Sequence, residues 1–382
     1  MGPIWISAGE LSGDMHGARL INALRERNPD LAFTGMGGPH MAAERGFAPL
    51  FRIEELSVMG VTEVVRQLPG ILRLLSRIRQ ALAEKKPRAV IVIDAPSFHF
   101  RVIKAARSLG IPVYCYIGPK AWAWKESRAR FIKENVRRLI SILPFEVDFY
   151  KRFGMDIDYV GNPLVDMVDW ERIKGITPVP GKIGLLPGSR DREITSLTPE
   201  FGKAARILLE KLPRLQFHMA RAPGIAGEKL RGLWPADVPL TIDPPDNRYA
   251  FMRECEMLIA ASGTATLEAA LTETPTLVAY KVSPVTYALG KAFINIPYIS
   301  LSNLILDKPL FPELLQKDAD GPNLAAKALE WLAPGNGSRP LDAVRGELAG
   351  LRSRMGEPGA VNRAADIILK DIATLPDGKG TP

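Results

Sequence analysis

The sequence predicts an α/β protein made of two Rossmann-like domains with a cleft between them. Short apolar segments alternate with amphipathic segments along the chain, which favours parallel sheets covered by helices on both faces. The alternation pauses over residues 166–181, a stretch that ends in Thr-Pro-Val-Pro-Gly, and then begins again. A chain of 382 residues is also too long for one common core and suits two domains.

The first half of the chain contains the clearest buried strand, AVIVID at 89–94, and a helix over 98–109 follows it. A strand at 4–8 precedes a helix that is stopped by Asn-Pro-Asp at 28–30. Further short strands are predicted at 31–34, 113–117, 139–143 and 158–160. We place the first domain at residues 1–168.

The second half repeats the pattern, with a helix over 197–210 and strands at 182–186, 216–220, 240–242, 258–261 and 276–280. We place the second domain at residues 182–335. The helical segment 336–375 is expected to pack across the domains or to be exchanged in a homodimer. In such a pair of domains, ligands bind in a crevice at the carboxyl ends of the strands.

The chain is basic, with a formal net charge of +8 and a pI near 9.4, so we expect an anionic partner. No zinc-finger, RNA-recognition or helix-turn-helix pattern is visible, and we expect no nucleic-acid partner. No run approaches the roughly 18 apolar residues of a membrane span, and the start lacks a secretory signal, which predicts a cytoplasmic protein. Cys115 and Cys255 are expected to be buried free thiols.

A basic amphipathic helix is predicted over residues 69–88. Its apolar residues recur at helical spacing and include Leu74, while Arg73 and Arg77 are among the cations around them. Such a helix is typical of a protein that lies on an anionic lipid surface, and Trp122 belongs to an aromatic and basic cluster expected to act with it. The alternative is a helix packed on the core with a charged outer face.

The segment at 257–275, MLIAASGTATLEAALTETP, predicts a strand, a turn at Ser262-Gly263 and a helix from Thr264. Such a turn leaves backbone N–H groups without partners at the positive end of the helix dipole, so we predict a phosphate site there. Glu268 follows Thr264 by one helical turn, where its carboxylate would accept hydrogen bonds from sugar hydroxyls. The alternative is an ordinary turn with Glu268 facing solvent.

A second anion-binding loop is predicted after the first strand of the second domain. Gly188 permits an unusual backbone angle, Ser189 offers a hydroxyl and an amide, and Arg190 offers a planar charged fork suited to a diphosphate. Both loops would lie on one edge of the second sheet. The alternative is that Arg190 is a plain surface arginine.

Acidic residues also follow two strands of the first domain. Asp94 ends the strand at 89–94, where a carboxylate facing the crevice could accept a proton from a substrate hydroxyl or could equally cap the next helix. Glu10, Ser12, Gly13 and Asp14 lie in the loop after the first strand, where Ser12 or Asp14 is alternatively a helix cap.

Eight motifs occur in a set order: SAGELSGD at 7–14, LSVMGVTEV at 56–64, IDAPSF at 93–98, WAW at 122–124, LPFE at 143–146, LLPGSR at 185–190, SGTATLE at 262–268 and SLSNLIL at 300–306. The ordered set resembles the lipid A disaccharide synthases, a family of bacterial glycosyltransferases, nearly from end to end. The chain departs from the family pattern at Gly118, Lys120, Asn162, where the family usually has His, and Ser302, where it usually has Pro. The departure at position 162 puts a catalytic role there in doubt.

The resemblance implies the GT-B fold and transfer of 2,3-diacylglucosamine from its UDP carrier to 2,3-diacylglucosamine 1-phosphate (lipid X). The product would be a β-1,6 disaccharide formed with inversion, plus UDP. By the same resemblance Asp94 is the essential aspartate, Arg190 and Glu268 contact the nucleotide, and Glu10 and Asn303 lie at the active cleft.

Inverting transfer needs a base for the acceptor hydroxyl and charge stabilisation for the departing UDP. Asp94 is expected to be the base, and Arg190 with the amides of Ser262–Thr264 is expected to hold the diphosphate, so neither a metal nor another cofactor is expected. Because both substrates carry acyl chains, peripheral attachment to the inner membrane is expected. The alternatives are a UDP-sugar 2-epimerase of the same architecture and a non-catalytic lipid-binding protein.

Overall fold

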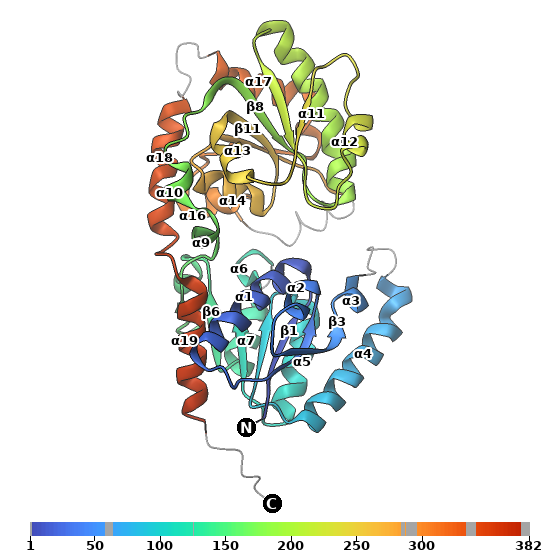
Figure 1. The fold of residues 1–382 in the computed structure, drawn as a ribbon, viewed down its shortest axis with the longest axis vertical. Helices are drawn as coiled ribbons and strands as arrows, with labels where there is room; N and C mark the ends of the chain where they lie inside the picture. Colours follow the sequence, from blue (N-terminus) through green and yellow to red (C-terminus); the bar gives the residue numbers. More distant parts are fainter. Residues whose placement is uncertain are drawn as a thin grey trace, which may run out of the picture. The chain divides into compact units, whose positions relative to one another are not determined.

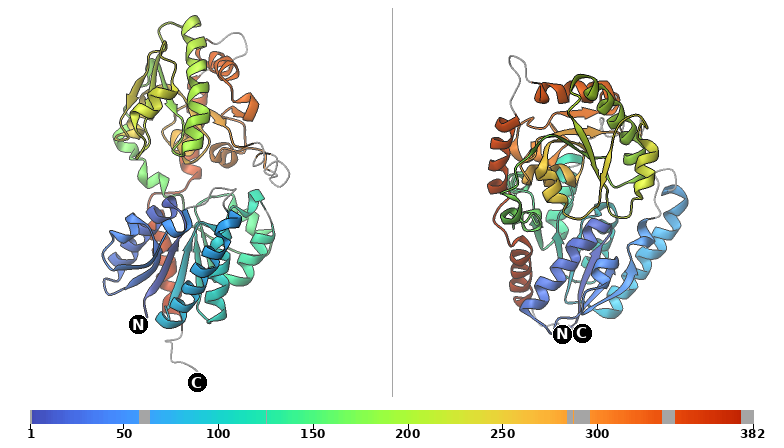
Figure 2. Two further views of the ribbon diagram at one scale, coloured as in Figure 1. Left: turned by 90° about the vertical axis from the view of Figure 1, so that its right-hand side faces the viewer. Right: turned by 45° about the horizontal axis from the view of Figure 1, so that its top comes forward.

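The computed structural model describes residues 2–57, 64–124, 126–283, 287, 296–333 and 341–375 (Figure 1). The chain forms two compact units, of which the first contains Met1–Pro163 with Glu357–Pro382 and the second contains Leu164–Gly356. Each unit has a parallel sheet with helices on both faces (Figure 2). The predicted α/β class with two Rossmann-like domains is therefore confirmed.

The first unit has seven parallel strands among its described residues, in the order β3 (Phe47–Arg52), β2 (Phe33–Gly37), β1 (Ile4–Ala8), β4 (Ala89–Ile93), β5 (Val113–Tyr116), β6 (Arg138–Ser141) and β7 (Asp158–Tyr159). Alternate residues of β1 enter two cores, as the period of a strand requires. Ile4 and Ile6 pack with α1 (Leu11–Arg27) and α19 (Ala360–Ala373). Trp5 packs on the opposite face with α4 (Val64–Lys85) and α5 (Pro96–Ser108).

The second unit has six parallel strands among its described residues, in the order β10 (Thr241–Asp243), β9 (Gln216–Ala220), β8 (Val179–Leu186), β11 (Cys255–Ala261), β12 (Thr276–Tyr280) and β13 (Glu313–Leu315). The strands β8 and β11 are neighbours, with Leu186 opposite Ala260. The two predicted anion-binding loops therefore leave the same edge of this sheet. Cys115 and Cys255 are free and buried, as predicted.

Helices cover both sheets. The first unit adds α2 (Pro39–Ala42), α3 (Glu54–Ser57), α6 (Ala121–Trp124), α7 (Ser127–Asn135) and α8 (Glu146–Lys151). The second unit contains α9 (Leu164–Met167), α10 (Trp170–Ile173), α11 (Asp191–Lys211), α12 (Gly227–Leu233), α13 (Arg248–Glu254), α14 (Thr264–Leu271), α16 (Leu301–Leu306), α17 (Gly321–Leu332) and α18 (Leu341–Arg354). Among them, α14 packs against α13, α16 and α18.

The two C-terminal helices pack on different units. Arg345 of α18 donates hydrogen bonds to the carbonyl oxygens of Cys255 at 3.2 Å and Glu256 at 2.6 Å in the second unit. Asp371 of α19 accepts a hydrogen bond from the hydroxyl of Tyr114 at 2.6 Å in the first unit. The chain therefore returns to its first unit to cover one face of the first sheet.

The α4 helix turns its apolar stripe toward the core. Leu74, Ile78 and Leu82 are buried, with Leu74 only 4% exposed. The prediction that Leu74 contacts a membrane is therefore wrong, because helical periodicity alone does not distinguish a core-facing stripe from a lipid-facing one. Arg73 and Arg77 are exposed on the outer surface of the helix.

Candidate active site

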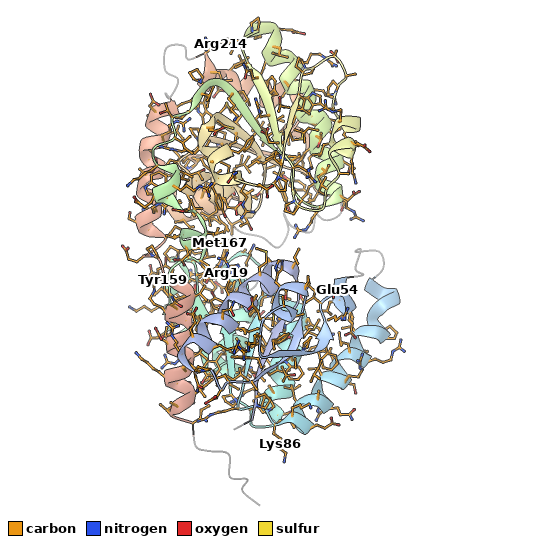
Figure 3. All side chains as sticks on the ribbon, viewed as in Figure 1. Arg19, Glu54, Lys86, Tyr159, Met167 and Arg214 are labelled. Atoms are coloured by element: carbon orange, nitrogen blue, oxygen red, sulfur yellow. The ribbon has the colours of Figure 1, made fainter. Side chains whose placement is uncertain are left out.

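The carboxyl edge of the first sheet carries the loops that follow β1 and β4. Glu54, just after β3, and Lys86, just before β4, mark the carboxyl and amino edges of this sheet (Figure 3). In a parallel sheet every strand presents its carboxyl end at the same edge, which is where ligands of such folds bind. The residues predicted from the first domain are therefore gathered on one side of this unit.

Asp94 follows β4 directly and has a left-handed backbone, with φ 52°. Ala95, the N-cap of α5, has φ 46°, and a non-glycine residue in this region costs on the order of 1 kcal/mol. Asp94 does not cap α5, and its half-buried carboxylate makes no hydrogen bond or ion pair with any residue that the structure describes. The strained turn therefore presents an acceptor that is free for a ligand.

The side chain of His99 links this turn to β1 through two hydrogen bonds. Its Nδ1 lies 2.6 Å from the backbone oxygen of Asp94, and its Nε2 lies 3.0 Å from Oγ of Ser7 on β1. A carbonyl oxygen only accepts, so Nδ1 carries the proton and Nε2 accepts from the Ser7 hydroxyl. Complete burial lowers the pKa of His99 to about 4, which keeps the ring neutral. The pattern of the sequence did not reveal this link, because Ser7 and His99 are far apart along the chain.

The loop after β1 lies beside the Asp94 turn. A Cβ atom on Gly9 would fall 2.3 Å from Cβ of Ala95, and one on Gly13 would fall 3.3 Å from a carbonyl oxygen of β4. Glycine at both positions therefore permits this close approach. Glu10, the N-cap of α1, makes no side-chain cap hydrogen bond, and both Glu10 and Ser12 are exposed.

Asp14 is buried, in contrast to the exposed Glu10 and Ser12 of the same segment. Its carboxylate is fully buried and accepts hydrogen bonds from the backbone amides of Gly38 at 2.7 Å, His40 at 2.8 Å and Met41 at 3.1 Å. These contacts cap the start of α2. Asp14 therefore fixes the neighbouring loop and offers no free oxygen to a ligand.

Glu146 is a buried carboxyl near the end of β6 that the sequence analysis quoted only within a motif. Its Oε1 accepts the indole N–H of Trp122 at 3.0 Å, and its Oε2 accepts the hydroxyl of Ser141. Trp122 is half-buried and also packs edge-to-face on Phe145 at 5.0 Å, which favours a structural role over the predicted membrane contact. Asn162 is buried nearby and donates to the carbonyl oxygen of Ile142 at 3.1 Å.

Burial raises the pKa of Glu146 from 4.5 to about 7. A carboxyl group with a raised pKa contributes stability that is present below its unfolded pKa and is lost as the pH rises through its folded pKa. We therefore expect the thermal midpoint of the wild type to fall, relative to that of Glu146→Gln, as the pH rises from about 4.5 to about 7. The exposed Glu134→Gln serves as the control, and parallel pH profiles for the wild type and Glu146→Gln would contradict the assignment.

The loop after β8 is shaped by a glycine and by a cap. Gly188 has φ 107°, and a Cβ atom there would fall 2.5 Å from Oε2 of Glu193. Glu193 accepts hydrogen bonds from the amides of Ser189 at 3.2 Å and Arg190 at 3.3 Å, and it pairs with the guanidinium of Arg190 at 3.2 Å. The side chain of Arg190 is 77% exposed, so it can exchange this surface partner for a ligand anion.

The turn after β11 leads into the eight residues of α14. The Ser262 amide donates to the carbonyl oxygen of Ala279 at 3.0 Å, and Gly263 is the N-cap without a side-chain cap bond. The amides of Thr264 and Ala265 donate to no residue that the structure describes. Together with the helix dipole, these unpaired amides are suited to an anion next to the loop that holds Arg190.

Glu268 lies beneath this turn and is buried rather than facing solvent. Its Oε1 pairs with the guanidinium of Arg248 at 2.6 Å and accepts from the hydroxyl of Tyr249 at 3.3 Å. Burial raises the pKa of Glu268, and Arg248 and Tyr249 oppose that shift. Arg248 and Tyr249 are further candidate site residues, and the sequence did not predict them because neither belongs to a motif that marks an anion site.

The SLSNLIL segment supports α14 from behind. Ser302, which stands where the family usually has Pro, donates its hydroxyl to the carbonyl oxygen of Thr266 at 2.9 Å. Asn303 is fully buried, and its amide bonds both the N–H and the C=O of Phe311 and one oxygen of Glu313. The N–H and C=O groups of the Asn303 amide are therefore both engaged within the protein, which favours a positioning role, and its place at the cleft stays a prediction.

The described residues contain no group of three or more His, Cys, Asp and Glu side chains placed to hold a metal ion. No helix in the described ranges is long and apolar enough to cross a membrane. The groups available at the two sheet edges are a carboxylate on the first unit and, on the second, a guanidinium, helix N-terminal amides and the Glu268 cluster.

Solved structures of sugar-nucleotide enzymes share this fold. A UDP complex of S. aureus MnaA aligns with a TM-score of 0.64 and 14% identity over 99% of this chain and 98% of that one. The UDP-GlcNAc 2-epimerase of Neisseria meningitidis aligns with a TM-score of 0.63 and 14% identity over 96% and 100%. The calicheamicin glycosyltransferase CalG4 gives 0.61 and 12% over 99% and 100%. The chain therefore has the GT-B fold of glycosyltransferases and related epimerases.

The sequence identifies the family within that class. The lipid-A-disaccharide synthetase family matches residues 4–343. The lipid-A-disaccharide synthase of Myxococcus xanthus is 39% identical over 98% of both chains, and that of Rhodospirillum centenum is 38% identical over 97% of this chain and 94% of its own. The chain belongs to the lipid-A-disaccharide synthetase family.

Proposed function

We propose that this glycosyltransferase transfers 2,3-diacylglucosamine from UDP-2,3-diacylglucosamine to lipid X, forming the β-1,6 tetraacyl disaccharide 1-phosphate and UDP. Membership of the family supports the reaction, and the free carboxylate of Asp94 in its strained turn is the observation that supports the mechanism. The likeness to 2-epimerases is a likeness of fold alone. A non-catalytic lipid-binding role leaves the unpaired Asp94 unexplained.

In this mechanism the acceptor hydroxyl of lipid X attacks the anomeric carbon of the donor while Asp94 takes its proton. The bond from that carbon to the UDP oxygen breaks, and UDP leaves with the bonding electrons. Arg190 and the amides at Thr264 and Ala265 bind the diphosphate and stabilise its developing charge. The carboxylate of Glu268 accepts hydrogen bonds from the ribose hydroxyls.

The direct test supplies both lipid substrates in detergent and measures UDP release together with disaccharide formation. We expect release only when lipid X is present. Conversion of the donor to a sugar epimer without an acceptor would instead support the hypothesis of a 2-epimerase. Binding of both lipids without formation of either product would support the hypothesis of a non-catalytic lipid-binding protein.

Replacing Arg190 by Gln is expected to raise the Kd for UDP by about 10–100-fold, because a charge-assisted hydrogen bond to the diphosphate is lost. Isothermal titration with UDP measures this effect. Arg192→Gln is the matched control, since Arg192 is exposed in the same first turn of α11. Equal Kd values for the two variants would remove Arg190 from the donor site.

The chain is further proposed to act at an anionic membrane surface, because both of its proposed substrates are acylated and the protein carries a net charge of +8. The residues that were predicted to contact the membrane differ in their exposure and in their contacts within the protein. Arg73 is exposed on α4, whereas Leu74 is buried and Trp122 is engaged with Glu146.

A further inference from the structure

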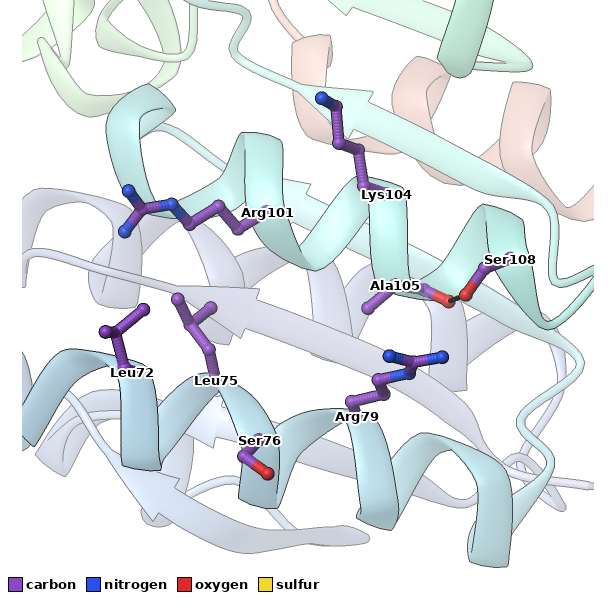
Figure 4. A pocket seen from close by; sticks show the side chains of 8 residues that line it. All are labelled: Leu72, Leu75, Ser76, Arg79, Arg101, Lys104, Ala105 and Ser108. Atoms are coloured by element: carbon purple, nitrogen blue, oxygen red, sulfur yellow. Dashed lines mark hydrogen bonds between the residues drawn. The ribbon is translucent and has the colours of Figure 1, made fainter. Parts of the chain in front are cut away.

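Cationic side chains in the two units differ in whether a carboxylate fixes them. In the groove between α4 and α5 on the first unit, the guanidinium groups of Arg79 and Arg101 lie at opposite ends (Figure 4). None of the described residues that line this groove is acidic, so no carboxylate in it fixes either arginine. On the second unit, by contrast, the guanidinium of Arg248 lies against Glu268, a carboxylate of the proposed donor site. Arg248 is therefore placed to control the charge of a group that binds substrate.

Arg248, Tyr249 and Glu268 form a closed network between α13 and α14. Arg248 donates to the hydroxyl oxygen of Tyr249 at 2.7 Å and pairs with Oε1 of Glu268 at 2.6 Å. Its guanidinium also lies over the Tyr249 ring, 4.8 Å from the ring centroid. Because the Tyr249 oxygen accepts from Arg248, the Tyr249 hydrogen is free to be donated to Oε1 of Glu268 at 3.3 Å. One oxygen of the carboxylate is therefore held by two donors.

The second oxygen of Glu268 is left for a ligand. Oε2 forms no hydrogen bond or ion pair with any residue that the structure describes. The side chain of Glu268 is 7% exposed, and Oε2 is not among the fully enclosed, unpaired polar atoms of the described residues. The network thus fixes one oxygen of the carboxylate and leaves the other in contact with solvent.

Burial makes the charge of Glu268 depend on Arg248. Taking a carboxylate out of water raises its pKa, and burial has this effect on Glu268. The charge of Arg248 opposes the shift, and the hydrogen bond from Tyr249 adds to that opposition. A protonated carboxyl group accepts hydrogen bonds more weakly than a carboxylate, so it would bind a ribose hydroxyl less tightly. Without Arg248 the pKa of Glu268 would rise further, and the group would take up a proton at a higher pH.

Other titratable groups near α14 have different partners. This helix packs against α13, α16, α18, β11 and β12, and α16 carries no titratable side chain. The remaining elements contribute groups that are engaged away from Glu268: Arg253 pairs with Glu273, Glu254 pairs with Lys182, Glu256 accepts from the Gly181 amide, Arg345 and Arg352 donate to backbone oxygens, and Tyr280 interacts with the charges of Glu193 and Arg190. The charge of Glu268 is therefore set mainly by its burial and by the two residues of α13.

We propose that Arg248 is a positioning residue whose charge holds Glu268 as an anion, with Oε2 open to the ribose of the donor. The site then selects ribonucleotides over deoxyribonucleotides. The inference deepens the proposed function and rests on it, because it concerns the nucleotide part of the donor. Arg248 acts through Glu268 and needs no contact of its own with the nucleotide.

The test measures the Kd of the full-length protein for UDP, 2′-deoxy-UDP and 3′-deoxy-UDP by calorimetry. Measurements run from about pH 5.5 to about pH 9, a range in which a buried carboxyl group titrates. The selectivity is the larger ratio of a deoxynucleotide Kd to the UDP Kd. Because all three ligands carry the same diphosphate, this ratio cancels the ionisation of the diphosphate.

The variants are Arg248→Met, Arg248→Lys and Glu268→Gln. The matched control is Arg253→Met, because Arg253 lies on the same helix and pairs with a different carboxylate, that of Glu273 at 3.1 Å. We expect the wild type to prefer UDP by at least about tenfold at neutral pH, the usual effect of one hydrogen bond to a charged group. Arg253→Met is expected to keep that selectivity.

Arg248→Met is expected to lose most of the selectivity at neutral pH and to regain part of it as the pH rises, since Glu268 then ionises without the guanidinium. Arg248→Lys retains the cation and is expected to lie between Arg248→Met and the wild type. Glu268→Gln is expected to show a low selectivity that does not change with pH.

Two results for Arg248→Met would overturn the proposal. One is a selectivity equal to that of the wild type at every pH, and the other is an equal loss at every pH, which a displaced carboxylate alone would produce. An equal loss in Arg253→Met would also overturn it, because any disturbance of α13 would then have the same effect. Failure of the wild type to bind UDP would instead contradict the proposed donor site, so the two failures are distinguishable.

Discussion

Replacing Asp94 by Asn is expected to lower the turnover of the proposed transfer by about 10²–10⁴-fold, the usual contribution of a general base. The substitution isolates the carboxylate, because Asn tolerates the left-handed backbone that Asp94 adopts with φ 52°. The affinity for UDP is expected to stay unchanged, since Asp94 belongs to the first unit and the diphosphate loops belong to the second. Single-turnover release of UDP and calorimetric UDP binding measure the two quantities.

Asp30→Asn is the control for this experiment, because Asp30 is exposed in the loop after α1. It makes the same chemical change at a distance from any predicted site. Turnover of Asp94→Asn within a few-fold of the wild type would assign the base to another group. Loss of UDP binding in Asp94→Asn would show that the substitution disturbs the donor site as well as proton transfer from the acceptor hydroxyl.

Most of the fold was predictable from local patterns, and the exceptions have local causes. The buried parallel strand β4 and residues 257–261 of β11 are continuous apolar runs, which is typical of strands covered on both faces. The edge strand β3 was missed because FAPLFR contains Pro49 and is mostly exposed, so it lacks that signal. The start of α11 lies at Asp191, six residues before its predicted start at Leu197, because Glu193 provides a cap that apolar periodicity does not show.

The residues of the candidate site also differ in how well local sequence patterns predict them. Asp94, Arg190 and Thr264 were predictable because each follows a strand, and chain order alone places such residues on a sheet edge. The contacts of Glu268 with Arg248, and of Asn303 with Phe311, depend on how separate elements pack. Sequence patterns do not contain that packing, so they did not show that Glu268 is buried or that its carboxylate pairs with Arg248.

His99 connects Ser7 to the backbone oxygen of Asp94, and replacing His99 is expected to lower turnover strongly. His99→Leu is expected to lower kcat by about 10–100-fold with little change in KM for the donor, because the Asp94 turn loses the hydrogen bond that fixes its carbonyl oxygen. The same change is expected to cost about 1–3 kcal/mol of stability, since that partly buried oxygen is left without a donor. Steady-state kinetics and denaturant unfolding measure the two effects.

His99 is a positioning residue in this account, so the kinetic and structural effects must separate. His99→Gln can restore a donor to the turn and is expected to recover part of kcat, and Ser7→Ala is expected to cause a smaller loss because it removes only the partner of Nε2. A variant with Leu at position 99 that is destabilised but retains the wild-type kcat would limit His99 to a structural role.

The pH dependence of stability tests the same contact independently. A histidine whose pKa is lowered from 6.5 to about 4 by burial contributes stability that is present above pH 6.5 and is lost as the pH falls through about 4. The wild type is therefore expected to lose more unfolding free energy than His99→Gln over that window. Burial also lowers the pKa of His16 to about 4, but His16 is present in both proteins, so the difference between them reports on His99 alone.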